Sequence, residues 1–84
     1  MPKIPRDISG RELAKLLAKK FGYRIEREIG SHIRLSSNHT GREHKVTIPD
    51  HDGIKIGTLN SILKDVSEYL SISKEELLKE LFER

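Results

Sequence analysis

The side chains best suited to chemistry in this sequence are its four histidines, because cysteine is absent. Without cysteine there is no disulfide framework and no thiolate metal site. His39, His44 and His51 lack the spacing of an established metal site, and neither a Gly-x-Ser-x-Gly segment nor a glycine-rich phosphate loop occurs. We therefore expect no metal ion and no cofactor, and we disfavour a hydrolase triad and nucleotide hydrolysis.

His32 differs from the other histidines in its context. It follows Gly30 and Ser31, which suit a tight turn, and it precedes Arg34 on the same side of a predicted strand. An imidazole that titrates near neutrality suits general acid–base catalysis on a phosphodiester. Nearby cations would hold the phosphate and stabilise its transition-state charge, and we expect Arg34 and Lys45 on that side. An incidental turn histidine would show the same local pattern.

The charge of the chain is unevenly distributed. Residues 1–45 carry 11 Lys and Arg against 5 Asp and Glu, whereas residues 46–84 carry 5 against 8. A basic half favours a polyanionic partner, although an ordinary solvated surface gives the same count. Arg11, Lys15 and Lys19 form one row on a predicted helix. Such a row either follows a phosphate backbone or is the solvated side of an amphipathic helix, and we take Lys15 and Lys19 as candidate contacts.

The elements that must position these side chains follow from the periodicity. Ser9 to Glu12 reads as a capping box, and apolar residues at helical spacing extend a first helix to Phe21, with Gly22 as its stop. Alternating segments predict strands over 23–29, 32–36 and 45–48. A second helix is expected over 59–70 with Thr58 as its N-cap, and a third from a capping box at Ser73 to Phe82.

The register of the first hairpin can be predicted from its isoleucines. If Ile25, Ile29, Ile33 and Leu35 all face the core, Ile29 lies opposite Ile33. This pairing requires an odd-numbered connection, namely the three residues 30–32. A two-residue loop would pair Ile29 with His32 and turn one apolar set outward. His32 is expected at the turn or at the very start of the second strand, outside the core.

These elements define an α+β fold, with a three-stranded antiparallel sheet and its helices on one face. The 84 residues suffice for a single domain, 1–84, whose thin core leaves no room for a deep substrate cavity. Chemistry should therefore take place on an exposed face and act on a large substrate. No apolar run is long enough to span a membrane and no signal peptide is recognisable, so we expect a cytoplasmic protein.

Several motifs together resemble the HicA family of toxins, also known as YcfA-like proteins. The resemblance begins at residues 9–13, passes through Gly22 and Tyr23, and reaches the family's Gly-Ser-His at residues 30–32. It resumes at residues 46–49 with His51, and continues through 57–59, 61–63 and 73–78. Nearly the whole chain is covered, in order and at family-like spacing.

The resemblance implies a double-stranded-RNA-binding-domain-like fold, α-β-β-β-α with an extra short C-terminal helix. It also implies metal-independent cleavage of messenger RNA, with His32 as the catalytic residue, and a HicB antitoxin that covers the active face. Many members carry a second histidine after the first, where this chain has Ile33. Its absence removes one possible second proton-transfer group. His44 and His51 flank the third predicted strand, and either could assist in proton transfer.

Two other functions are compatible with the sequence. A non-catalytic double-stranded-RNA-binding module usually carries a lysine cluster at the start of the helix after the sheet. Here residues 57–61 contain no lysine, which counts against simple duplex binding. A protein-interaction domain could instead recruit a partner through an exposed sheet edge.

Overall fold

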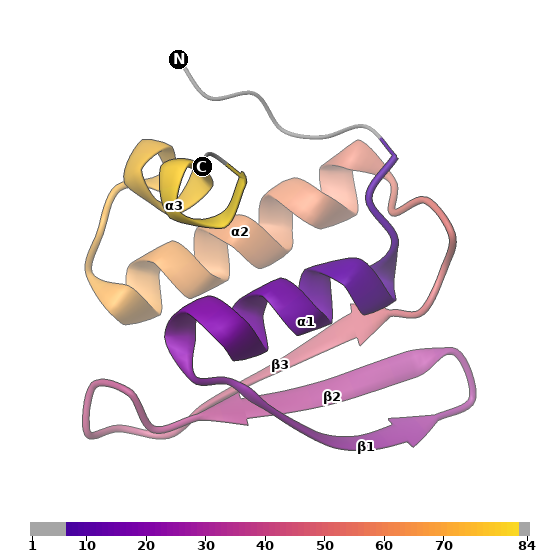
Figure 1. The fold of residues 1–84 in the computed structure, drawn as a ribbon, viewed down its shortest axis with the longest axis horizontal. Helices are drawn as coiled ribbons and strands as arrows, with labels where there is room; N and C mark the ends of the chain where they lie inside the picture. The colour runs from indigo at the N-terminus through magenta and orange to yellow at the C-terminus, as the bar shows by residue number, and fades with distance from the viewer. Residues whose placement is uncertain (1–6, 83–84) are drawn as a thin grey trace.

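A computed structural model describes residues 7–82 of the chain. The elements follow the order α-β-β-β-α-α, as predicted (Figure 1). They are α1 (Gly10–Phe21), β1 (Arg24–Ile29), β2 (His32–Ser37), β3 (His44–Pro49), α2 (Ile56–Leu70) and α3 (Lys74–Phe82). The α+β prediction is therefore confirmed.

The limits of α1 are set by the two signals read from the sequence. The Ser9 hydroxyl accepts a hydrogen bond from the Glu12 amide at 3.1 Å, and the Glu12 carboxylate accepts one from the Ser9 amide at 3.3 Å. Gly22 ends the helix with a φ of 70°, a left-handed conformation that glycine adopts without steric cost. The capping box and the glycine stop are both confirmed.

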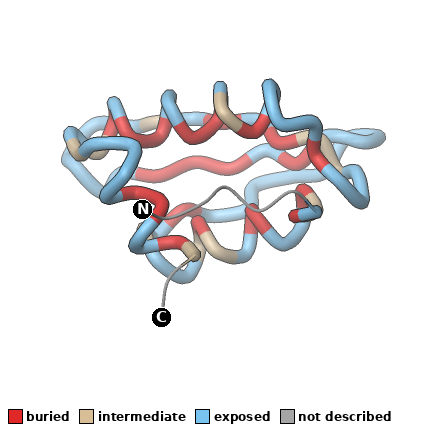
Figure 2. The backbone as a smooth tube through the Cα atoms, turned by 90° about the horizontal axis from the view of Figure 1, so that it is seen from above, coloured by how far each residue is buried: buried red, intermediate tan, exposed pale blue. Residues whose placement is uncertain are grey.

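The sheet has the strand order β1-β2-β3, with both neighbouring pairs antiparallel. Helices α1 and α2 pack on one face of it, and α3 packs on the two helices rather than on the sheet (Figure 1). The core lies between these layers, where β2 contributes Ile33 and Leu35 at 0% and 1% exposure. Figure 2 shows the buried parts of the helices turned inward. Nothing within residues 7–82 packs on the opposite face, which we call the open face.

The predicted register of the first hairpin is wrong. The turn contains two residues, Gly30 and Ser31, and Ile29 pairs directly with His32. Gly30 has a φ of 56° at the first central position, the arrangement that favours glycine in type II′ hairpins. His32 is thereby the first residue of β2 and is exposed, so its expected place outside the core is confirmed.

Contrary to the prediction, the isoleucines of β1 are therefore not buried in the core. The strand is exposed throughout, with Ile25 at 42% and Ile29 at 52%. A bulge at Glu26 shifts the register between Ile25 and Arg27. As a result, Ile25 shares the helix-covered side with its partner Leu35, whereas Ile29 lies on the open face beside His32.

The start of α2 also differs from the prediction. The helix begins at Ile56, with Lys55 as an N-cap that makes no side-chain hydrogen bond, so Thr58 does not cap it. The predicted start of α3 agrees with the structure, in which the helix begins at Lys74. The Ser73 hydroxyl accepts a hydrogen bond from the Glu76 amide at 3.0 Å, as expected for an N-cap residue.

Candidate nucleic-acid interface

The open face is organised in three rows that run across the strands. Because side chains alternate along a strand, the burial of Ile33 and Leu35 places His32, Arg34 and Ser36 on the opposite side. His32 and Arg34 are exposed there, whereas the small Ser36 is buried at 3% exposure. Cross-strand pairing then gives the other members of each row. The rows are Ile29–His32–Pro49, Arg27–Arg34–Thr47 and Arg24–Ser36–Lys45.

This arrangement brings together the site residues predicted on the sheet. His32 and Arg34 are two positions apart on β2, a separation of about 6.7 Å between backbone positions. Thr47 lies beside Arg34, and Lys45 lies in the third row on β3, about 13 Å along the strands from the row of His32. The imidazole, a guanidinium and an ammonium are therefore presented on one solvent-facing surface.

A shallow hollow of about 460 Å³ lies on this surface, where the second and third rows line it and His32 of the first row does not. Its charged lining consists of Arg27, Arg34, Lys45 and Glu26. The ion pairs found across residues 7–82 include none of these four side chains. The hollow thus combines three unpaired cations with one carboxylate, a balance that suits an anionic group.

Arg27 was missed by the sequence analysis because its predicted strand was a regular alternation. In such a strand Arg27 would share a side with Ile25 and Ile29. The bulge at Glu26 turns Arg27 to the open face, opposite Arg34. The Gly30-Ser31 dipeptide was the available signal, because glycine followed by serine favours a two-residue hairpin and hence the observed pairing of Ile29 with His32.

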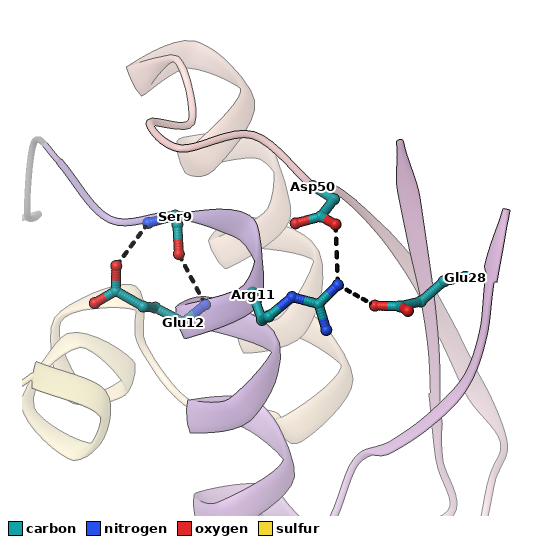
Figure 3. A network of polar contacts seen from close by, with 5 residues as sticks. All are labelled: Ser9, Arg11, Glu12, Glu28 and Asp50. Carbon is teal, nitrogen blue, oxygen red and sulfur yellow. Dashed lines mark hydrogen bonds and ion pairs between the residues drawn. The ribbon is translucent and has the colours of Figure 1, made fainter. Parts of the chain in front are cut away.

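The turn before His32 is held by contacts with the loop after β3. The Asp50 amide donates to the Ser31 carbonyl at 2.7 Å. The Arg11 guanidinium of α1 forms ion pairs with Glu28 of β1 and with Asp50, the latter at 3.0 Å (Figure 3). Helix, hairpin and loop therefore meet at the corner of the sheet that carries His32.

Lys15 and Lys19 do not lie on the open face with His32. Both are exposed on α1, which covers the other side of the sheet. They follow Arg11 at four-residue intervals, and Arg11 reaches β1, so the row runs along the β1 side of the helix. The structure therefore brings Arg34 and Lys45 to the face of His32, but separates Lys15 and Lys19 from it.

His44 and His51, the two candidates for a second proton-transfer group, have different surroundings. His44 is largely buried, with Nδ1 sharing a hydrogen bond of 2.7 Å with the Tyr23 hydroxyl and Nε2 at 3.2 Å from an Asp65 carboxylate oxygen. Its ring also stacks on Tyr69 at 4.6 Å. Both ring nitrogens are engaged, so His44 joins β3 to α2 and to the start of β1. His51 is exposed in the loop after β3.

Among the residues that the structure describes, no group of three or more His, Cys, Asp or Glu side chains could hold a metal ion. Within the same residues, each helix is too short or too polar to cross a bilayer.

The fold and surface define a small α+β domain with an exposed histidine on a basic sheet face. Comparison with protein families identifies it further, because the model of the HicA toxin of bacterial toxin–antitoxin systems matches residues 10–67. The chain belongs to the HicA toxin family, and is thus a toxin of a toxin–antitoxin system. Searches of curated proteins and of solved structures gave no significant match. The double-stranded-RNA-binding-domain-like description stays a prediction.

Proposed function

We propose that this toxin is a metal-independent endoribonuclease that cleaves messenger RNA in the cytoplasm. The observation that supports this proposal is the exposed imidazole of His32 on the same face as Arg34 and Lys45. The two cations would hold the scissile phosphate and stabilise its added charge in the transition state. Lys15 and Lys19 would contact RNA that continues past the β1 edge.

The proposed reaction uses the ribose of the substrate as the nucleophile. The 2′-oxygen forms a bond to phosphorus while the bond from phosphorus to the 5′-oxygen breaks. One proton leaves the 2′-hydroxyl and one is gained by the departing 5′-oxygen. His32 performs one of these transfers and water performs the other. The products are a 2′,3′-cyclic phosphate and a 5′-hydroxyl, and the cations of the face fulfil the role that a metal ion would otherwise have.

The test is incubation of the purified protein with single-stranded RNA in the presence of a chelator. We expect the wild type to release fragments ending in a 2′,3′-cyclic phosphate, and His32→Ala to release none. His39→Ala is the matched control, because His39 is also exposed but lies in the loop between β2 and β3. Circular dichroism checks that each variant is folded. Cleavage that requires a divalent metal, or that survives His32→Ala, would overturn the proposal.

A binding measurement at several salt concentrations, made beside the cleavage assay, decides between catalysis and simple RNA binding. Salt-dependent binding without cleavage would identify a non-catalytic RNA-binding module. The start of α2 argues against duplex binding, since the first turn after Lys55 carries no basic residue.

We also propose that a HicB-type antitoxin neutralises the toxin by covering the open face. Ile29 is half exposed and is the direct cross-strand neighbour of His32, so a protein that buries it would also cover the imidazole. Ile29→Asp should weaken inhibition by a co-expressed antitoxin while the free toxin still cleaves RNA. Equal inhibition of both forms would place the antitoxin elsewhere.

A further inference from the structure

We propose that Arg27 and Arg34 form a paired phosphate clamp for single-stranded RNA on the open face. This inference rests on the proposed ribonuclease function and adds Arg27, which the sequence did not suggest. The two residues pair directly across β1 and β2. Cross-strand neighbours have Cβ atoms about 4.5–5.5 Å apart, close enough for both guanidinium groups to reach one phosphate.

The pairing is unfavourable for the isolated fold. Like charges directly opposite on neighbouring strands are destabilising, and neither arginine has an ion-pair partner among residues 7–82. Lys45 lines the same hollow and adds a third positive charge. An anion seated there would relieve this repulsion, so the arrangement is understandable as a binding site.

The bulge in β1 supports the same conclusion. It adds Glu26 between two paired positions, and this single extra residue moves Arg27 from the helix-covered side to the open face. Bulges commonly redirect a side chain beside a functional site. Here the redirected guanidinium lies in the row next to the row of His32, and the two rows are about 6.7 Å apart along the strands.

Single-stranded RNA is the occupant that fits the surface. Its phosphates match the cations, and its ribose supplies the 2′-hydroxyl that His32 requires. The three rows contain no Phe, Tyr or Trp on which bases could stack. The face should therefore hold the RNA mainly through its backbone. Glu26 is the one acidic group of the hollow, and it should weaken rather than support phosphate binding.

Binding is measured by fluorescence anisotropy with labelled oligouridylate, in a His32→Ala background so that the RNA stays intact. Arg27→Ala should weaken binding roughly tenfold, as expected for loss of a charge-assisted hydrogen bond. It should also reduce the slope of log affinity against log salt by about 0.7, the contribution of one phosphate contact on a single strand. Arg27→Lys should retain the slope but not the full affinity.

Lys64→Ala is the matched control, because it also removes one exposed cation but lies on α2. It should leave affinity and slope unchanged, whereas Glu26→Gln should tighten binding. If Arg27→Ala behaves like Lys64→Ala, the proposal fails and the pair serves another ligand, such as an acidic protein surface. A wild type that binds RNA through Arg27 without cleaving it would overturn the ribonuclease function and leave the clamp standing.

Discussion

The Asp50 amide donates a hydrogen bond to the Ser31 carbonyl at 2.7 Å. This contact fixes the hairpin turn before His32 to the loop that follows β3. The Gly10 amide donates to the His51 carbonyl of the same loop at 3.0 Å, which brings the start of α1 to this corner. The Gly-Ser-His segment and the first turn of α1 are thus linked through residues 50 and 51.

Arg11 should control the rigidity of this corner. Its hydrogen bonds to Glu28 and to Asp50 raise its pKa above the usual value, so the guanidinium stays charged wherever the protein is folded. In Arg11→Gln the charge is lost and the Asp50 side chain is released. The Asp50 amide should then exchange its hydrogen faster, as measured by NMR, with little change in global stability because the pair is exposed.

Lys15→Gln is the control for this measurement, since Lys15 lies one turn further along the same row and belongs to none of the ion pairs described for residues 7–82. Equal exchange rates at Asp50 in the two variants would show that Arg11 does not stabilise the corner.

Gly10→Ala should destabilise the protein strongly. A Cβ at this position would lie 1.9 Å from the Pro49 carbonyl oxygen, and neither backbone can move without disturbing the contact between α1 and β3. We expect a loss of about 1–3 kcal/mol in the free energy of unfolding, measured in urea, which is the usual cost of overpacking. Gly57→Ala, in α2 with open space around it, should be neutral or stabilise the protein by roughly 0.5–1 kcal/mol. Equal effects of the two substitutions would contradict this account.

Gly30→Ala tests the hairpin turn. Apart from its two chain neighbours, no residue has an atom within 4 Å of the added Cβ, so the cost comes from the positive φ and should be about 1–2 kcal/mol. Relief of this strain would change the turn and displace His32, so RNA cleavage should also decrease. Gly53→Ala, in open space and without a positive φ, should preserve both stability and cleavage. Full activity in Gly30→Ala would show that the turn does not position the imidazole.

The elements of the fold were predictable because their signals are local. The capping box at Ser9, the stop at Gly22 and the alternation around Ile33 each involve only neighbouring residues. The predicted start of α2 was wrong because Lys55, the N-cap residue of this helix, makes no side-chain hydrogen bond to it. The sequence therefore contains no capping residue that marks where the helix begins.

The register of β1 was not predictable from the alternation of its isoleucines. That reasoning assumed that Ile25 and Ile29 both need burial, but an edge strand can leave such residues exposed. The bulge then allows the two-residue turn while keeping Ile25 toward the helices. For the candidate site, Arg34 followed from β2 alone, whereas Arg27 depended on the bulge and the pairing of two strands.

Tyr23 should make stability decline at alkaline pH. Burial, together with the charges of Tyr69 and Asp65, raises the pKa of its phenol well above the usual 10.0. Above pH 10 the unfolded chain loses this proton while the native protein keeps it. The contribution of the neutral phenol is therefore complete below pH 10 and is lost above it, by up to about 1.4 kcal/mol per pH unit. Urea unfolding at a series of pH values measures this slope.

Tyr23→Phe separates this effect from other alkaline titrations. Near neutral pH the variant should be less stable by about 1 kcal/mol, because His44 Nδ1 loses the hydroxyl at 2.7 Å. Above pH 10 its stability should fall less steeply than that of the wild type, so the two curves converge. Tyr69 is the one other tyrosine in the chain, so the ultraviolet titration of the variant reports Tyr69 alone. Parallel stability curves would show that the Tyr23 phenol ionises equally in the native and unfolded states.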